Sequence, residues 1–125
     1  MIGDNMAAIY NMAVNQGEDF IIKLLIKDES NNPVDISTNT FSGQIRERYD
    51  SANVAASFSF EFGQHTGEVY VKLTNAVTAA IPVQASSQSN KRPTTEFVYD
   101  IEQTKSGVKT RILQGIVSVS ANVTK

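Results

Sequence analysis

The chain contains 125 residues, carries a formal net charge of −2 with a pI near 5.3, and has no cysteine. This length fits a single domain over residues 1–125, with enough chain to bury a core of its own. The absence of cysteine excludes disulfides, thiolate metal sites and cysteine catalysis. The slightly acidic balance offers no basic footprint for nucleic acid, and no apolar run is long enough to predict membrane insertion.

Two strands are predicted in the first part of the chain, where apolar and polar residues alternate with a period of two. In residues 9–15, the apolar face contains Tyr10, Met12 and Val14. Residues 20–26 are apolar on both faces apart from one lysine, which predicts a central strand.

The middle of the chain predicts a turn and three more strands. The turn is "DESNNPVD", whose Asn and Pro residues favour chain reversal. Alternation then predicts strands in "FSGQIRERYD", "VAASFSFEF" and "GEVYVKLT". The apolar positions that alternate with polar ones are Phe41, Ile45 and Tyr49 in the first and Phe58, Phe60 and Phe62 in the second. In the third, Val69, Val71 and Leu73 are expected to point inward.

The last third of the chain begins with a break in this rhythm. "TNAVTAAIP", opened by Thr74 and closed by Pro82, predicts about two helical turns or fewer. Residues 83–95 are polar and predict an exposed loop. Strands over residues 97–104 and 111–123 follow, joined at "KSGV", where glycine can take the positive φ of a two-residue hairpin turn.

These elements predict an all-β fold, a single immunoglobulin-like β-sandwich of about seven strands with one short helical turn. A small β-barrel is the alternative. Residues 1–8 are expected to form a flexible or partner-contacting segment, and residues 83–95 an exposed loop that either docks or is disordered.

The chain offers little chemistry for an active site. His65 is the single histidine and lies between two glycines, which indicates a turn residue between strands. A zinc site needs three or four ligands, and no GxSxG motif accompanies His65 as the base of a serine triad. A hydrolase that uses His65 with an unrecognised partner is the weakest of the functional alternatives.

A calcium loop is suggested by the spacing of Asp28, Ser30 and Asn32. However, Pro33 stands where such a loop needs glycine, and Asn39 stands where it needs a bidentate glutamate. A turn between strands is therefore the preferred interpretation.

The remaining charged residues are predicted to lie on the surface. The acidic pairs are Glu61 with Glu68 and Asp100 with Glu102, and solvent-facing acids do not suit a glycosidase cleft. Basic side chains that could hold an anionic partner are Arg46, Arg48, Lys91 and Arg92, although Glu47 and Asp50 favour local salt bridges for the first two. The glycosylation sequon at Asn122 carries no weight without a secretion signal. The sequence thus predicts no catalytic, cofactor or metal residue and no small-molecule substrate.

Three stretches, in this order, carry a resemblance: "GEDFIIKLLIKDESNNPVDIS", "TGEVYVKLTNAVTAAIP" and "FVYDIEQTKSGVKTRILQGIVSVSANVTK". Together they resemble the immunoglobulin-like β-sandwich modules of tailed-bacteriophage virions, such as the N-terminal domain of baseplate upper proteins. The resemblance implies that residues 33–36 close a turn and begin the next strand. It also implies that Tyr99 and Asp100 lie in the penultimate strand and that Gly115 allows close packing in the last.

The resemblance implies a non-enzymatic virion protein, made in the host cytoplasm, that docks onto neighbouring subunits in the tail, baseplate, neck or fibre-attachment region. Its partners would be other virion proteins or copies of itself. The alternatives are a capsid decoration protein and a carbohydrate-binding β-sandwich. The second would need Tyr49, Tyr70 and Tyr99 as exposed stacking platforms, because the chain has no tryptophan.

Overall fold

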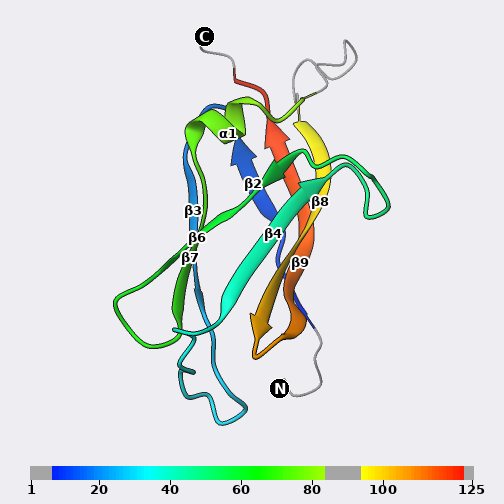
Figure 1. The fold of residues 1–125 in the computed structure, drawn as a ribbon. Coiled ribbons are helices and arrows are strands. Elements are labelled where there is room, and N and C mark those ends of the chain that lie inside the picture. Colours follow the sequence, from blue (N-terminus) through cyan, green and yellow to red (C-terminus); the bar gives the residue numbers. More distant parts are fainter. Residues whose placement is uncertain (1–6, 84–93, 123–125) are drawn as a thin grey trace.

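A computed structural model of the chain describes residues 7–83 and 94–122 and shows two β-sheets packed face to face (Figure 1). One sheet has the strand order β1-β9-β8-β4-β5, with β2 also paired to β9, and the other has the order β3-β7-β6. Two separate sheets confirm the all-β immunoglobulin-like sandwich, and the barrel alternative is wrong.

Nine strands and one helix are defined within the described residues, two strands more than predicted, because two of the predicted strands are divided. The elements are β1 (Ala8–Ile9), β2 (Met12–Asn15), β3 (Phe20–Leu25), β4 (Thr40–Arg46), β5 (Ala56–Ser57), β6 (Ser59–Phe62), β7 (Glu68–Leu73), α1 (Asn75–Ala79), β8 (Thr94–Lys105) and β9 (Val108–Ser120).

The β8–β9 hairpin forms the centre of the larger sheet. Its tight turn at Ser106 and Gly107, which the sequence predicted, has φ angles of 52° and 82°. Two positive φ angles match the right-handed twist of the strands that the turn joins. The two strands pair from Lys105 and Val108 to Thr94 and Ser120, so β8 begins earlier than predicted and β9 is shifted toward the turn.

The core lies between the sheets and is built from alternate residues of the paired strands. Its largest fully buried side chains are Tyr99, Phe97, Ile45, Leu73, Ile81, Ile101, Val14, Val69, Val71, Val117 and Val119. The predicted inward positions in β7 are therefore confirmed. In β4, Ile45 is buried, whereas Tyr49 lies beyond the strand end and is 58% exposed.

The first predicted strand is divided at Tyr10. The side-chain oxygen of Asn11 accepts the N–H of Ile116 at 3.0 Å and takes the place of a backbone acceptor, so β1 and β2 pair with β9 on either side of a kink. The kink turns Tyr10 outward, to 47% exposure, against the prediction that it shares a face with Met12.

A buried tyrosine holds this kink in place. Tyr99 of β8 is paired with Gly115 of β9, and its hydroxyl donates to the carbonyl oxygen of Tyr10 at 2.5 Å. A Cβ atom at Gly115 would collide with that same carbonyl group. The absence of a side chain at Gly115 therefore lets β1 and β2 approach β9, as the sequence resemblance implied for this glycine.

The short helix predicted near residue 75 is present and is tied to the turn before β3. Thr74 caps its N-terminus by accepting the N–H of Val77. The fully buried hydroxyl of Thr78 accepts the N–H of Gly17 at 3.0 Å and lies 2.8 Å from the carbonyl oxygen of Glu18, to which it donates. Helix and turn thus close one end of the sandwich.

The predicted strand "VAASFSFEF" changes sheets halfway along. Ala56 and Ser57 pair with β4, but from Ser59 onward the chain pairs with β7 in the other sheet. Phe58 lies at the crossing and is buried, whereas Phe62 at the far end is 48% exposed, against prediction. Alternation assumes a single sheet and therefore misplaces a residue beyond such a crossing.

β3 is paired on one side only within the described residues, so it is an edge strand and not a central one. The strand after the "DESNNPVD" turn begins at Thr40 and not within residues 33–36. The predicted 83–95 loop and 1–8 segment lie largely outside the described residues.

We expect Tyr99→Phe to lower the free energy of unfolding by about 1 kcal/mol, because it removes one buried hydrogen bond without creating a large cavity. Gly115→Ala should lower the free energy of unfolding by more, about 1–3 kcal/mol, because the new methyl group displaces the Tyr10 carbonyl. Urea denaturation measures both. Tyr49→Phe, at an exposed position, is the matched control, and an equal loss there would contradict this role of Tyr99.

Burial of the Tyr99 ring, and to a smaller degree the neighbouring Tyr10 and Tyr49, raises the pKa of the Tyr99 hydroxyl above its ordinary value of 10.0. The unfolded chain then loses this proton at a lower pH than the folded chain. Stability should therefore be independent of this group below about pH 10 and fall as the pH rises further. The stability of the wild type should therefore approach that of Tyr99→Phe as the pH rises across that range, and a constant difference between the two would contradict the assignment.

Candidate functional site

His65, the sequence's single candidate base, lies in the turn between β6 and β7, as predicted, with its side chain 78% exposed. Its ring Nδ1 lies 3.4 Å from a carboxylate oxygen of Glu68, and its backbone N–H donates to the same carboxylate at 3.3 Å. The Nζ of Lys23 on β3 lies 3.5 Å from Glu68 as well. These three side chains form the one histidine cluster of the chain.

Glu68 differs from its prediction as a plain solvent-facing acid, since its side chain is 13% exposed. Desolvation, the largest single influence, raises the pKa of the Glu68 carboxyl. Hydrogen bonds from His65 and the positive charges of Lys23 and His65 together outweigh it and hold that pKa below its ordinary value of 4.5. An ionised, partnered carboxylate suits a structural ion pair better than an acid catalyst.

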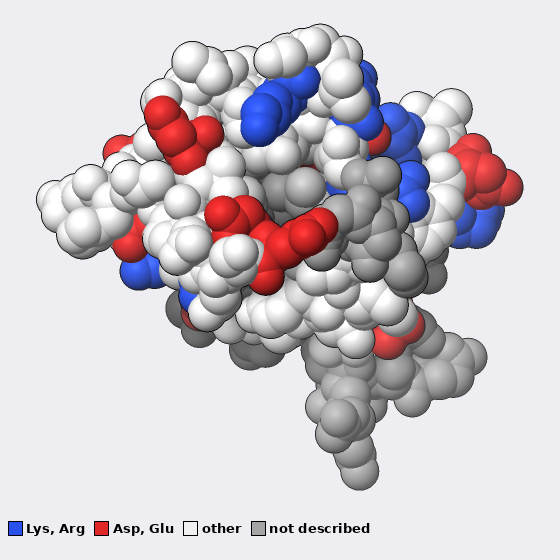
Figure 2. All heavy atoms as spheres, turned by 90° about the horizontal axis from the view of Figure 1, so that it is seen from below, with Lys and Arg blue, Asp and Glu red and all other residues white. Residues whose placement is uncertain are grey.

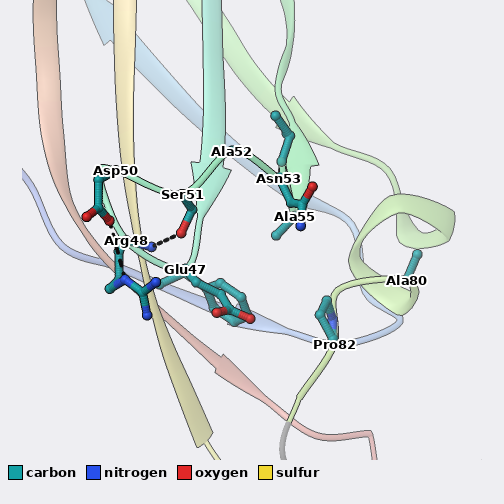
Figure 3. Close-up of a pocket in the computed structure, with 11 residues that line it drawn as sticks. Glu47, Arg48, Asp50, Ser51, Ala52, Asn53, Ala55, Ala80 and Pro82 are labelled. Carbon is teal, nitrogen blue, oxygen red and sulfur yellow. Dashed lines mark hydrogen bonds and ion pairs between the residues drawn. The ribbon is translucent and has the colours of Figure 1, made fainter.

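A hollow of about 540 Å³ lies between the loop that follows β4 and the chain that leaves α1. Figure 3 shows the polar residues of the loop on one side and Ala80 and Pro82 on the other. The loop's polar groups bond one another: Arg48 pairs with Asp50 at 3.3 Å, and its N–H donates to Ser51 Oγ at 3.1 Å. Arg48, Asp50 and Ser51 are therefore already partnered within the loop.

The outer face of the larger sheet carries Arg46, Asp100 and Glu102. Arg46 donates to the Ser51 carbonyl and to Gln44, each at 2.7 Å, so it is held locally and does not pair with Glu47 or Asp50. Asp100 pairs with Arg111 at 3.2 Å, across from β8 to β9.

The calcium-loop interpretation is not supported by the contacts of Asp28. One oxygen of its carboxylate accepts the N–H groups of Ser30 and Asn32, at 2.9 and 3.0 Å. This geometry is the local turn that Asp side chains commonly stabilise. Asn39 is buried and bonds Gln103, away from the surface. Within the described ranges, no group of three or more potential metal ligands is found.

The stacking platforms expected of a carbohydrate-binding module are not brought together. Tyr99 is 1% exposed, so its predicted exposure is wrong, and it packs against Phe58 inside the core with ring centroids 5.8 Å apart. Tyr49 lies in the loop after β4, whereas Tyr70 lies on β7 in the opposite sheet.

Acidic and basic side chains are mixed on the end of the sandwich that Figure 2 shows, and neither sign covers that end alone. Lys91 and Arg92 lie outside the described residues, as do the two residues that complete the sequon at Asn122. No helix in the described part of the chain has the length and apolar character needed to span a bilayer.

The feature that the sequence did not predict is the pair of open strand edges of the smaller sheet; within the described residues, β1 and β5 are likewise outer strands of the larger sheet. Within residues 7–83 and 94–122, no strand pairs with the outer side of β3 or of β6. Large apolar side chains are exposed at both, namely Ile21 at 56%, Leu25 at 44% and Phe62 at 48%. Unpaired edges with apolar side chains are natural templates for association. The available signal was that residues 20–26 are apolar on both faces, but this pattern suggested a central strand with neighbours on both sides.

No protein family matches the chain, and no curated protein sequence matches it. Among solved structures, the extracellular domain of the voltage-gated sodium channel beta4 subunit is similar over 94% of this chain and 96% of its own, with 4% identity and a TM-score of 0.43. That domain is described as a parallel homodimer with a role in cell–cell adhesion. The likeness transfers no partner or activity, and the sandwich assignment rests on the strand pairing itself.

We expect Glu68→Gln to reduce the acid sensitivity of the fold. Because the pKa of Glu68 is lowered in the folded state, its ionised form stabilises the protein above about pH 4.5, and this contribution is lost as the pH falls further. Urea denaturation between about pH 6 and 3 should give a shallower loss of stability in Glu68→Gln than in the wild type. His65→Ala, which keeps Lys23, should lie between them; identical profiles would show that the cluster has no role in stability.

Proposed function

We propose that this chain is a non-enzymatic structural protein of a tailed-bacteriophage virion, which acts by docking onto neighbouring subunits. The order of its sequence segments, which resembles virion β-sandwich modules, is the ground for the virion itself. The observation that carries the docking role is the pair of open edges at β3 and β6, with large apolar side chains exposed on them.

The described surface favours association over catalysis. In the hollow beside the loop after β4, Arg48, Asp50 and Ser51 already bond one another, and the histidine cluster holds its carboxylate in the ionised form. Edge strands with exposed apolar residues, by contrast, can extend a sheet into a partner through backbone hydrogen bonds. The tail, baseplate, neck and fibre-attachment region are the proposed positions. No observation favours the carbohydrate-binding alternative, since its three tyrosines are dispersed or buried.

The virion assignment predicts that the protein copurifies with intact particles in a fixed number of copies. Quantitative mass spectrometry of gradient-purified particles, compared with the infected-cell lysate, measures this directly. Detection in the lysate together with absence from the particles would contradict the proposal. Antibody labelling in electron micrographs separates the tail from the capsid surface, where a decoration protein would lie.

A further inference from the structure

We infer that the partner of these two edges is a second copy of the chain, with β6 of one copy pairing alongside β3 of the next. The inference rests on the proposed docking role and gives it a specific surface. Both edges belong to the same three-stranded sheet and lie at its opposite sides, in the order β3-β7-β6. One copy can therefore offer each edge to a different neighbour.

The backbone of β3 is oriented for this pairing. Ile26 donates its N–H to the backbone carbonyl oxygen of Gly67 at 2.8 Å, one residue beyond the point where Leu25 of β3 lies opposite Glu68 of β7. In an antiparallel strand, alternate residues direct their backbone groups to the same side. The backbone groups of Ile21, Lys23 and Leu25 consequently point to the open edge.

The backbone of β6 is also oriented for this pairing. Gly63 donates its N–H to the backbone carbonyl oxygen of Glu68 at 2.9 Å. The backbone groups of Ser59 and Glu61 therefore point to the same side as those of Gly63 and bond β7. The backbone groups of Phe60 and Phe62 then point to the open edge. In a parallel pair, each residue bonds the two residues that flank its neighbour on the other strand. Phe60 can thus bond Ile21 and Lys23 of the next copy, and Phe62 can bond Lys23 and Leu25.

The directions of the strands agree with such a pair. β3 and β6 are each antiparallel to β7, so they run the same way. A second copy displaced sideways within the plane of the sheet would bring its β3 beside β6 as a parallel neighbour. Phe60 would then lie beside Ile22 and Phe62 beside Leu24, and the exposed ring of Phe62 would gain an apolar cover.

Charge complementarity selects this register. Across the sheet, Lys23 is paired with Tyr70, and Tyr70 is paired with Glu61, so one row begins with a cation and ends with an anion. Adding a copy in register places Glu61 directly opposite the next Lys23. Both charges already have a partner within the chain, Lys72 for Glu61 and Glu68 for Lys23.

The contact would thus extend a row of alternating charges on a solvent-facing surface. Pairs of this kind add little affinity but disfavour wrong registers and orientations. Backbone hydrogen bonds and the cover over Phe62 would supply most of the stabilisation. Because the two edges differ, the contact is head-to-tail, which generates a closed ring or an open filament and not an isolated two-fold dimer.

The test uses two single variants, Lys23→Cys and Glu61→Cys, in a chain that has no other cysteine. With a short bismaleimide, a mixture of the two should give a covalent dimer on a denaturing gel, and neither variant alone should. Each molecule has one thiol, so no cross-link can form within a copy. A dimer from Lys23→Cys alone would overturn the inference in favour of β3–β3 pairing, and no dimer from the mixture would overturn it outright.

A charge exchange provides an independent measurement on a chain without cysteine. Lys23→Glu and Glu61→Lys should each weaken self-association about tenfold in size exclusion with light scattering, because each places like charges in register. Their equimolar mixture should recover association, since every contact then joins opposite charges. Lys109→Glu, on the other sheet, is the control and should associate as the wild type does.

Outcomes for the two proposals are separable. A wild-type chain that remains monomeric at every concentration, with no cross-linked dimer, would overturn pairing between copies. Detection of the protein in purified particles would still support the virion role, and the docking partner would then be a different subunit. Self-association of a protein absent from particles would support the edge pairing and contradict the virion role.

Discussion

The antiparallel pairing of β8 with β9 is the interaction on which the rest of the structure depends. β4 pairs with β8, and both β1 and β2 pair with β9, so most of the larger sheet is assembled on this one hairpin. The hairpin also supplies Phe97, Tyr99 and Val117 to the core. A tight turn joins strands that are adjacent in sequence, so the scaffold forms at a low cost in loop entropy.

Tyr99 and Gly115 connect this hairpin to the beginning of the chain. The tyrosine spans the space left by the glycine and bonds the Tyr10 carbonyl at the kink between β1 and β2. One large and one absent side chain at paired positions thus fix where the first strands lie. A polar group is buried in this arrangement, but it is hydrogen-bonded, so its desolvation is offset.

The smaller sheet is the one proposed to take part in assembly. It contains three strands, and each outer strand keeps one side open within the described residues. The charges along its outer face, from Lys23 to Glu61, are arranged so that one edge complements the other. The same sheet that completes the core is therefore the one proposed to join neighbouring subunits, and stability and assembly draw on separate faces and edges of its strands.

Local patterns in the sequence predicted the β class, the tight turn at Gly107, the short helix after β7, and the inward residues of β7, because alternation, turn chemistry and capping act over a few residues. Tertiary structure decided the rest. The chain changes sheets at Phe58, the side chain of Asn11 replaces a backbone acceptor, and β3 lies at an edge. Each depends on which distant strand is the neighbour, so local periodicity misplaced Phe62 and Tyr10. For the same reason the open edges were not predicted, since an edge is defined by the strand that does not pair with it.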